Sequence, residues 1–421
     1  MSGNLFPSVR DPYAALRFPE YRNFIIASFL FTVALLVQEV ALGYELYIVT
    51  RDPLALGLTG LAEAVPFIGL SLYGGHIADR NSKRRIILFS SGIITVGSFV
   101  LHLVARADAA HHIPTSLLVG VIYGMVFLIG LCRAFQSPAA MSLRAFLVPV
   151  EAYENAATWS SSAWQAGSIV GPTIGGFLFA GIGFSDTLLV VVGFLGIAIF
   201  LFSRISDRRQ PVESATENLI ESVREGLRFV WHTKTILYAI SLDLFSVLFG
   251  GVVALLPIYA EDILKVGASG LGILRAAPSV GAVLTLIILS RVSPMHHPLR
   301  NLMIAVTGFG VSILIFAVSP WMAVSVVALF FSGAFDSVSV VIRQTLLQLM
   351  TPDAMRGRVM AVNGIFVSSS NELGAFESGT AARLMGVIPS AVFGGVMTLV
   401  IVGWVSWKSR KQLTKFAEPS G

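Results

Sequence analysis

Ionisable side chains occur inside long apolar runs of this sequence, where charged groups are costly and rare. The acidic and basic residues at such positions are Glu39, Glu45, Glu63, Arg133, Asp243, Arg275, Asp336, Arg343, Glu372 and Glu377. Burial favours the neutral form of a carboxyl group, and a neighbouring guanidinium favours the charged form. A site that exchanges these two environments can take up and release a proton. The pattern therefore predicts proton transfer coupled to a conformational change.

Glu39 and Glu372 are the strongest candidates to carry a proton, with Asp336 and Arg133 as charge partners. Glu377 is a further candidate. It follows Glu372 by five residues, which is about 140° around an α-helix, so the two carboxylates should face different surroundings. The alternative for any one of these residues is a structural ion pair between helices, and the sequence leaves that open.

Polar and aromatic side chains near these charges are candidates to line a cavity for a small compound. They are Gln38, Tyr44, Trp164 and Asn371. The adjacent pairs His111-His112 and His296-His297 have no third ligand at a useful spacing, so we expect no metal site. No GxxxxGK[ST] pattern is present, so we expect neither an ATPase nor another enzyme, and no cofactor.

Membrane-spanning helices are the elements that must position these residues. Of the 421 residues, 55% are hydrophobic and 13% charged, with a mean hydropathy of +0.79, whereas soluble domains have about 25% charged residues. A helix needs ~20 apolar residues to cross the hydrocarbon core. Twelve windows fit: 23–50, 54–78, 84–105, 115–136, 157–180, 186–204, 236–260, 269–290, 300–318, 321–345, 359–382 and 387–407. We expect an all-α protein with twelve transmembrane helices.

The distribution of basic residues gives these spans an orientation. Of the 29 Lys and Arg residues, 23 lie in or border the segments on the side of the N-terminus, and four lie on the opposite side. This bias places both termini in the cytoplasm. The net charge of +5 might suggest nucleic-acid binding, but the basic residues form short clusters between apolar spans. We therefore expect the lipid bilayer, and not nucleic acid, as the partner of this chain.

The longest polar stretch divides the twelve spans six and six. It predicts an N-terminal six-helix bundle at 1–204, a cytoplasmic linker at 205–235 and a C-terminal bundle with a short tail at 236–421. The linker contains a predicted amphipathic helix at 221–231. An offset of 203 residues places Gly171, Gly176 and Gly183 on Gly374, Gly379 and Gly386, and an offset of 215 places Gly57 on Gly272. Parallel six-helix repeats with a binding site between them are typical of transporters.

The loop after the second span reads GGHIADRNSKRR (74–85) and combines glycine, aspartate and arginine at a regular spacing. The positions are Gly75, Asp79, Arg80 and Arg84. Glycine allows two helices to approach closely, and the basic side chains can bind the last carbonyls of neighbouring helices. Such contacts can hold the two halves together in an outward-facing state. The alternative is that the basic residues only set the membrane orientation.

The fifth span contains GSIVGPTIGG (167–176). Gly167, Gly171 and Gly175 recur every four residues and share one helix face, while Pro172 removes a backbone donor and permits a bend; Gly176 follows directly. This face suits a tight contact between helices. Ordinary helix packing is the alternative to a role in antiport. In the fourth span, Arg133 is followed three residues later by glutamine.

Together these motifs resemble the major facilitator superfamily. The loop matches the superfamily's cytoplasmic motif, except that Ser82 stands where glycine is usual, and the fifth span resembles the motif of antiporter members. The subgroup is similar to bacterial macrolide-efflux and enterobactin exporters. The resemblance implies a monomeric, proton-coupled exporter of a small amphipathic compound, of the drug or siderophore class, in the bacterial inner membrane. An importer or uniporter of the same fold is an alternative, and a non-transporting receptor is a weaker one.

Overall fold

The computed structural model describes residues 12–207 and 219–413, and every regular element in these ranges is helical. The first half contains five long helices: α1 (Pro19–Thr50), α2 (Pro53–Arg80), α3 (Lys83–Ala109), α4 (Thr115–Ala145) and α5 (Tyr153–Ser203). Proline stands at the start of α1 and α2, where its missing N–H costs nothing. The Asp52 carboxylate caps α2 by accepting a hydrogen bond from the Leu54 N–H at 3.0 Å.

The second half begins with α6 (Leu219–His232) and α7 (Lys234–Phe249). The rest of the seventh span is irregular: a 3₁₀ turn at Val252–Leu255, the short α8 (Leu256–Ile258) and a π-helical turn at Tyr259–Ile263. Regular helices then follow: α9 (Gly267–Leu289), α10 (Pro298–Val318), α11 (Met322–Met350), α12 (Asp353–Met385) and α13 (Val387–Leu413).

The predicted fold class is confirmed. Ten helical stretches in the described residues are long and apolar enough to cross a membrane. One of them, Val150–Ser203, contains two spans, because α5 breaks at Gly183, where φ is +78°. α12 has the length of a span but carries more charges, and it completes the twelve. Gly386 separates α12 from α13 with φ at +95°, so the two glycines paired by the 203-residue offset occupy the same place in the two halves.

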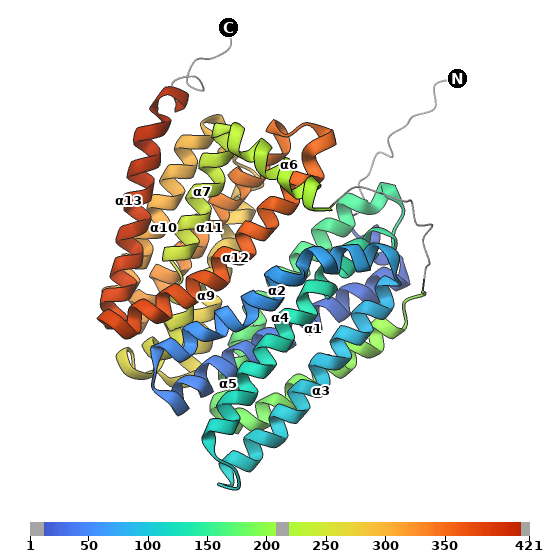
Figure 1. Cartoon of the computed structure of the whole chain (residues 1–421), viewed down its shortest axis with the longest axis vertical. Coiled ribbons are helices and arrows are strands. Elements are labelled where there is room, and N and C mark those ends of the chain that lie inside the picture. Colours follow the sequence, from blue (N-terminus) through green and yellow to red (C-terminus); the bar gives the residue numbers. More distant parts are fainter. Residues whose placement is uncertain (1–11, 208–218, 414–421) are drawn as a thin grey trace.

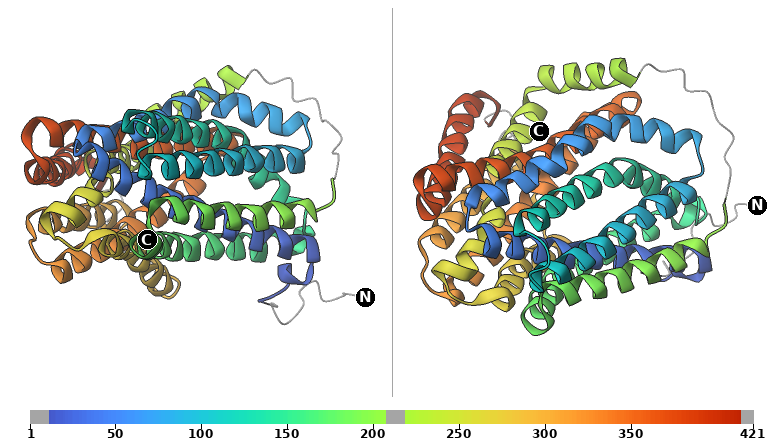
Figure 2. Two further views of the ribbon diagram at one scale, coloured as in Figure 1. Left: turned by 90° about the horizontal axis from the view of Figure 1, so that it is seen from below. Right: turned by 60° about the horizontal axis from the view of Figure 1, so that its bottom comes forward.

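The helices form two bundles (Figures 1 and 2). In the N-terminal bundle α1 packs along α5, α2 along α4, and α3 against α4 and α5. In the C-terminal bundle α9 packs against α11, and α10 packs against α11 and α13. Two helix pairs, α2 with α12 and α5 with α9, make the extensive contacts between the bundles. We call these two pairs the α2–α12 seam and the α5–α9 seam.

Glycine faces glycine at both seams. A Cβ atom added to Gly379 would lie 2.6 Å from the Gly57 Cα atom, and one added to Gly176 would lie 2.8 Å from the Gly272 Cα atom. No side chain fits at either contact, so the backbones pack directly. The sequence offsets relate Gly176 to Gly379 and Gly57 to Gly272, which makes the two seams equivalents of each other.

The fifth-span motif serves two surfaces. Gly167, Gly171 and Gly175 all face α1, and an added Cβ on Gly171 would lie 2.8 Å from the Leu36 Cβ atom. Gly176 faces the other way, toward α9. One face of the motif therefore packs α5 within its own bundle, and its last glycine joins that bundle to the other.

α6 corresponds to the predicted amphipathic helix and packs on α12. Gly226 lies against the Arg358 backbone, since an added Cβ atom would be 2.9 Å from that carbonyl oxygen. The Glu225 carboxylate pairs with the Arg358 guanidinium. Trp231 is 72% exposed on the outer side of the helix. Part of the predicted linker, residues 208–218, and the tail beyond residue 413 lie outside the described residues.

Candidate functional site

The two ends of the molecule differ in how the bundles meet. α1 begins and α5 ends at the end that carries α6, which we call the α6 end; α1 joins α2 at the opposite end (Figure 1). At this opposite end the Arg383 guanidinium of α12 donates a hydrogen bond to the Asp52 carboxylate at 3.0 Å. This ion pair ties the α2–α12 seam together where the helices leave its glycine contact.

Aromatic and charged side chains close the same end between α1 and the π-helical turn. The Tyr44 and Tyr47 hydroxyls donate hydrogen bonds to the carboxylates of Glu261 and Asp262, respectively. The Arg51 guanidinium lies 3.4 Å from Glu261 and 3.2 Å from Asp262. The π-helical turn brings these two consecutive carboxylates to face α1, so the N-terminal bundle is held to the C-terminal bundle by four polar contacts here.

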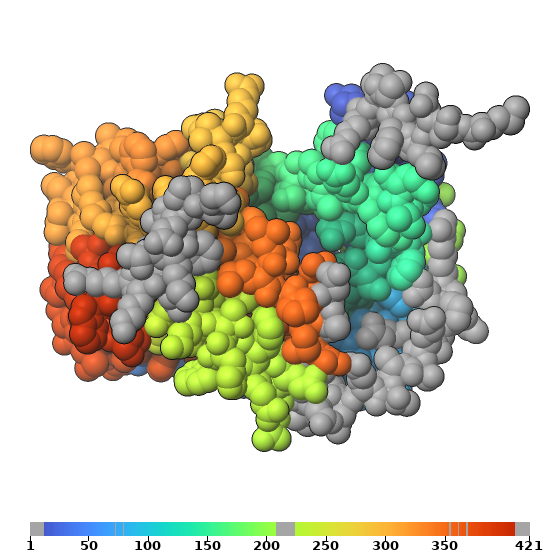
Figure 3. Space-filling view, turned by 90° about the horizontal axis from the view of Figure 1, so that it is seen from above, coloured from blue at the N-terminus to red at the C-terminus, as the bar shows by residue number. Residues whose placement is uncertain are grey.

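A cavity of about 800 Å³ lies between the bundles. Helices α1, α2, α4 and α5 line it on one side, and α7, α9, α10, α11 and α12 on the other. Seen from the α6 end, the surface is hollowed between the N-terminal and C-terminal bundles (Figure 3). The volume is within the range of sites that enclose drug-sized ligands, about 300–1,000 Å³.

One charge cluster in the cavity spans the α2–α12 seam. The Arg133 guanidinium of α4 donates a hydrogen bond to the Glu63 carboxylate of α2 and lies 3.5 Å from the Glu372 carboxylate of α12. It also stands over the Phe67 ring, 5.3 Å from the centroid. Gly60 makes room for this arrangement, because an added Cβ would lie 2.4 Å from the Glu372 carbonyl oxygen. One cation is thus shared by carboxylates from both bundles.

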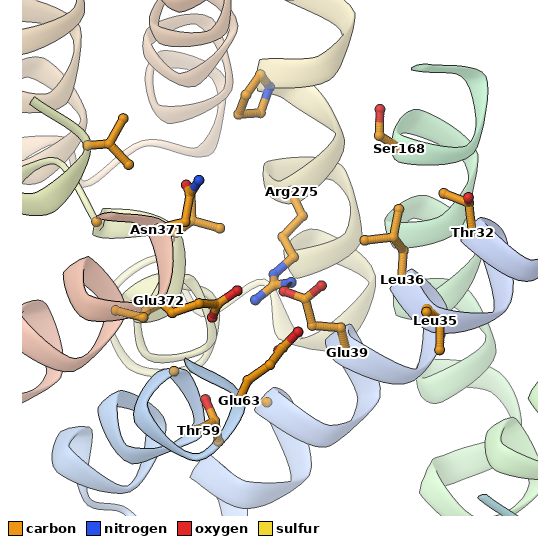
Figure 4. A pocket seen from close by; sticks show the side chains of 18 of the residues that line it. Thr32, Leu35, Leu36, Glu39, Thr59, Glu63, Ser168, Arg275, Asn371 and Glu372 are labelled. Carbon is orange, nitrogen blue, oxygen red and sulfur yellow. Dashed lines mark hydrogen bonds and ion pairs between the residues drawn. The ribbon is translucent and has the colours of Figure 1, made fainter. Parts of the chain in front are cut away.

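A second ion pair also crosses between the bundles, but here the cation comes from the C-terminal bundle and the carboxylate from the N-terminal bundle. The Arg275 guanidinium of α9, in the C-terminal bundle, lies 2.6 Å from the Glu39 carboxylate of α1. The two side chains meet near the centre of the cavity, with Glu63 and Glu372 close by (Figure 4). Any motion that separates the bundles at this depth must break this pair or the Arg133–Glu372 pair.

Asp336 of α11 lines the same cavity. Within the described part of the chain it has no ion pair and no hydrogen bond to its carboxylate. Among the residues that the structure describes, the cavity therefore holds two guanidinium groups and four carboxyl groups, on Glu39, Glu63, Asp336 and Glu372. Such a surplus can be neutralised by protons or by a bound cation.

The structure brings most of the predicted charged residues together. Glu39, Glu372, Asp336 and Arg133 all line the cavity. Glu377 does not line it, and its carboxylate accepts a hydrogen bond from the Ser378 hydroxyl at 3.4 Å. The different surroundings expected for residues five positions apart on one helix are observed.

The four residues predicted to line the cavity separate into two pairs. Trp164 and Asn371 do line it. Gln38 is instead fully buried and accepts a hydrogen bond from the Ser98 hydroxyl of α3 at 2.9 Å. Tyr44 belongs to the closed end. Since consecutive positions on a helix differ by about 100°, Gln38 and its neighbour Glu39 cannot face the same space.

Glu63 and Arg275 also line the cavity. The sequence predicts that both lie inside membrane spans, but they were not among the predicted site residues. Each follows a seam glycine by three residues: Glu63 follows Gly60, and Arg275 follows Gly272. Residues three apart share a helix face. A charged residue on the glycine face of a span is the signal that could have identified both.

The loop between α2 and α3 makes its described contacts within the N-terminal bundle. The Arg84 guanidinium donates a hydrogen bond to the Ser203 carbonyl oxygen at the end of α5, at 2.6 Å. This is the predicted contact of a basic side chain with a helix C-terminus. Arg80 is exposed, and the Asp79 side chain lies outside the described residues. The close glycine contact belongs to Gly74, whose added Cβ would lie 2.1 Å from the Ala134 carbonyl oxygen, whereas Gly75 faces open space.

Asp207 completes this arrangement just beyond α5. Its carboxylate accepts a hydrogen bond from the Ser82 hydroxyl and lies 3.2 Å from the Arg85 guanidinium. The hydrogen bond from Ser82, supported by the charges of Arg85 and Arg84, lowers the pKa of the Asp207 carboxyl group. The loop is therefore anchored to the end of α5 in this conformation.

The sequence model described as transmembrane secretion effector matches residues 10–419. The chain belongs to this family. Enterobactin exporter EntS of Shigella flexneri is 26% identical over 401 residues, which cover 91% of this chain and 90% of that protein. Enterobactin exporter EntS of Escherichia coli O127:H6 is 25% identical over 399 residues, with the same coverage.

Solved transporters share the fold. A bacterial homologue of the human lysosomal transporter Spinster, inward-facing and unoccupied, has a TM-score of 0.73 at 14% identity and covers 96% of this chain and 99% of that one. A D-xylose–proton symporter has a TM-score of 0.70 at 13% identity, with coverage of 92% and 97%. The chain is a multi-pass membrane protein of the major facilitator superfamily, as its motifs predicted. Its family and fold are those of transporters and not of enzymes.

Proposed function

We propose that this transporter exports a small amphipathic compound in exchange for protons, by alternating access of the central cavity to the two sides of the bacterial inner membrane. The observation that carries the proposal is the pair of ion pairs that cross between the bundles, Arg133–Glu372 and Arg275–Glu39. Breaking such a pair at low dielectric leaves uncompensated charges. Protonation of the carboxylate neutralises one of the two separated charges and lowers that cost, so proton uptake and bundle separation become linked.

The orientation of the cavity follows from the distribution of basic residues. The excess of Lys and Arg in segments on the N-terminal side assigns the α6 end to the cytoplasm. The conformation is then inward-open, with the periplasmic end closed by Tyr44, Tyr47, Arg51 and their carboxylate partners. Cargo enters from the cytoplasm, and the α2–α12 and α5–α9 seams separate on the periplasmic side as the cytoplasmic side closes.

The direction of transport is supported by relatives named as exporters over nearly the whole chain. The cavity combines apolar side chains such as Phe31, Leu36 and Ile313 with the charged cluster. This mixture suits a compound with both an apolar body and polar groups, of the drug or siderophore class.

Proteoliposomes with an imposed pH gradient and a luminal pH dye test the proposal. Enterobactin and a panel of amphipathic antibiotics are the first compounds to add. We expect one of them to cause proton movement, and we expect Glu39→Gln and Glu372→Gln each to reduce it at least about tenfold, since each removes a titrating group. Transport that persists in the double variant, with no proton movement for any compound, would show that proton coupling is wrong.

An importer or uniporter of the same fold is the second candidate. Accumulation of the compound in right-side-out vesicles, rather than its loss from them, would favour an importer or uniporter. A receptor without transport activity would bind the compound in detergent and move it in neither direction.

A further inference from the structure

The basic groups of the central cavity all have ion-pair partners, whereas one of its carboxylates has none among the described residues. This difference indicates which charge the transported compound carries. Four carboxyl groups and two guanidinium groups line it among the described residues. When all six are ionised, the cavity carries a net charge of −2. The walls between them combine apolar and aromatic side chains with neutral polar ones such as Ser168 and Asn371, which do not offset this charge.

Both guanidinium groups already have carboxylate partners. Arg133 is bound by Glu63 and lies 3.5 Å from Glu372. Arg275 pairs with Glu39, and its side chain is only 10% exposed. An anionic cargo would have to displace a carboxylate from one of these cations and would add to the existing negative charge. Like charges brought together in this way oppose binding.

Two carboxylates of the cavity, on Glu39 and Asp336, are in contrast not fully occupied by cations. The Glu39 side chain is 54% exposed although it holds Arg275 on one side. Asp336 lines the cavity from α11 with no ion pair or hydrogen bond to its carboxylate in the described chain. These two groups lie on different bundles, so each wall of the cavity contains a carboxylate, of which Glu39 is the more exposed.

Aromatic side chains lie in the same walls. Trp164 of α5, Phe31 of α1 and Phe309 of α10 all line the cavity. The face of an aromatic ring attracts a cation, with tryptophan strongest. The apolar surface and the negative charge therefore favour the same kind of ligand.

We propose that the cargo is an amphipathic cation, held by Asp336 and Glu39 and by the aromatic walls. The proposal rests on the transport function proposed above and names the class of its substrate. A bound cation neutralises Glu39, which also takes up a proton in the proposed transport cycle. Cargo and protons therefore compete for the cavity formed by Glu39, Glu63, Arg133, Arg275, Asp336 and Glu372, and this competition is the requirement for their exchange.

Tetraphenylphosphonium and tetraphenylborate form a matched pair of probes, since they have nearly the same shape and opposite charge. Binding of each to the purified full chain in detergent is measured by isothermal titration and by the fluorescence of Trp164, with Trp164→Phe as the background control. We expect the cation to bind at least about tenfold more tightly than the anion, a difference of about 1.4 kcal/mol. Equal or tighter binding of tetraphenylborate would overturn the proposal.

Substitutions of single carboxylates test which of them bind the cation. Asp336→Asn and Glu39→Gln should each weaken tetraphenylphosphonium binding at least about fivefold, which is about 1 kcal/mol, and leave tetraphenylborate unchanged or tighter. Glu45→Gln is the matched control on α1, because Glu45 does not line the cavity, and it should leave both affinities unchanged. If Asp336→Asn fails to fold, Glu39→Gln alone decides. Unchanged cation binding in a folded variant would remove that carboxylate from the site.

The two proposals fail separately. Proton-coupled transport of a compound without charge preference in binding would overturn the cationic cargo and leave the exporter intact. Preferential binding of tetraphenylphosphonium without proton movement in proteoliposomes would overturn proton coupling and leave the cationic cargo intact.

Discussion

The two seams between the bundles have the same packing and different chemistry. At each, a glycine pair brings two backbones into direct contact: Gly57 with Gly379, and Gly176 with Gly272. At the α2–α12 seam both helices carry a carboxylate that meets Arg133, on Glu63 and Glu372. At the α5–α9 seam, Arg275 is the only charged residue among those described that faces the cavity, and it turns away to α1.

The repeat between the two halves preserves the glycine packing of the seams and not their charges. The repeated positions are those that allow backbones to touch, and they are common to both halves. The charges are not repeated: the 203-residue offset sets Glu372 against an apolar residue of α5. We interpret the α5–α9 seam as a mechanical contact and the α2–α12 seam as one whose stability depends on protonation.

The largest expected effect comes from breaking the contacts that the seams share. Gly176→Val and Gly379→Val each place atoms inside a backbone contact, with Cβ 2.4 Å from the Ala268 oxygen and 2.6 Å from the Gly57 Cα atom, respectively. Overpacking of this kind costs about 1–3 kcal/mol or more. Both variants should abolish transport in proteoliposomes. Wild-type transport activity in either variant would show that its seam can accommodate the added side chain.

The next effect should distinguish the seams. Arg133→Ala leaves the Glu63 and Glu372 carboxylates without their shared cation at the α2–α12 seam, so two like charges remain close together. We expect at least about a 100-fold loss of proton-coupled transport. Adding Glu63→Gln should restore part of it, because the double variant removes one unpaired charge. If the double variant transports no faster than Arg133→Ala, the charges of Glu63 and Glu372 are not what Arg133 balances.

A smaller effect is expected at the periplasmic closure proposed above. Glu261→Gln combined with Asp262→Asn removes the charges that hold Arg51 and weakens the bonds to Tyr44 and Tyr47. Loss of these contacts shifts the population toward the outward-open state. Cysteines introduced along the cavity in a Cys132→Ala background should be labelled more rapidly from the periplasmic side. Unchanged labelling would mean that the glycine seams alone keep this end closed.

The smallest effect lies far from both seams. Asp207 has a lowered pKa in the folded protein, because Ser82 and Arg85 stabilise its charged form. Its contribution to stability is therefore present above the pKa of the unfolded chain, about 4, and is lost as the pH falls through the lower folded value. Asp207→Asn should lower the melting temperature slightly at pH 7 and progressively less as the pH falls below about 4, with transport unchanged. A large loss of transport would instead implicate the α2–α3 loop in the transport cycle.

Much of the fold was predictable because membrane helices have simple rules. The apolar windows match the helices, and the 203-residue offset paired Gly183 with Gly386, which both have positive φ at equivalent breaks. The break of the seventh span at Gly250 and Gly251 into 3₁₀, α and π turns was not predictable. It depends on close contacts with Gly374 and Phe309 from other helices.

The site was partly predictable for the same reason. Glu39, Glu372, Asp336 and Arg133 were recognisable as charges at membrane depth, but hydropathy does not give helix rotation. Gln38 and Glu39 have the same depth, and only packing against α3 decides which one faces the cavity. The partner of each charge comes from a distant helix, so the pairs Arg133–Glu63 and Arg275–Glu39 could not be read from spacing.

The glycine contacts of the seams have a consequence for how such transporters diverge. A joint made of backbone atoms places no demand on the side chains around it. The residues that line the cavity can therefore be replaced one by one to accept a different compound, while the joint continues to close with the same geometry. The same glycine contacts between the bundles can in this way be kept in transporters of many different compounds.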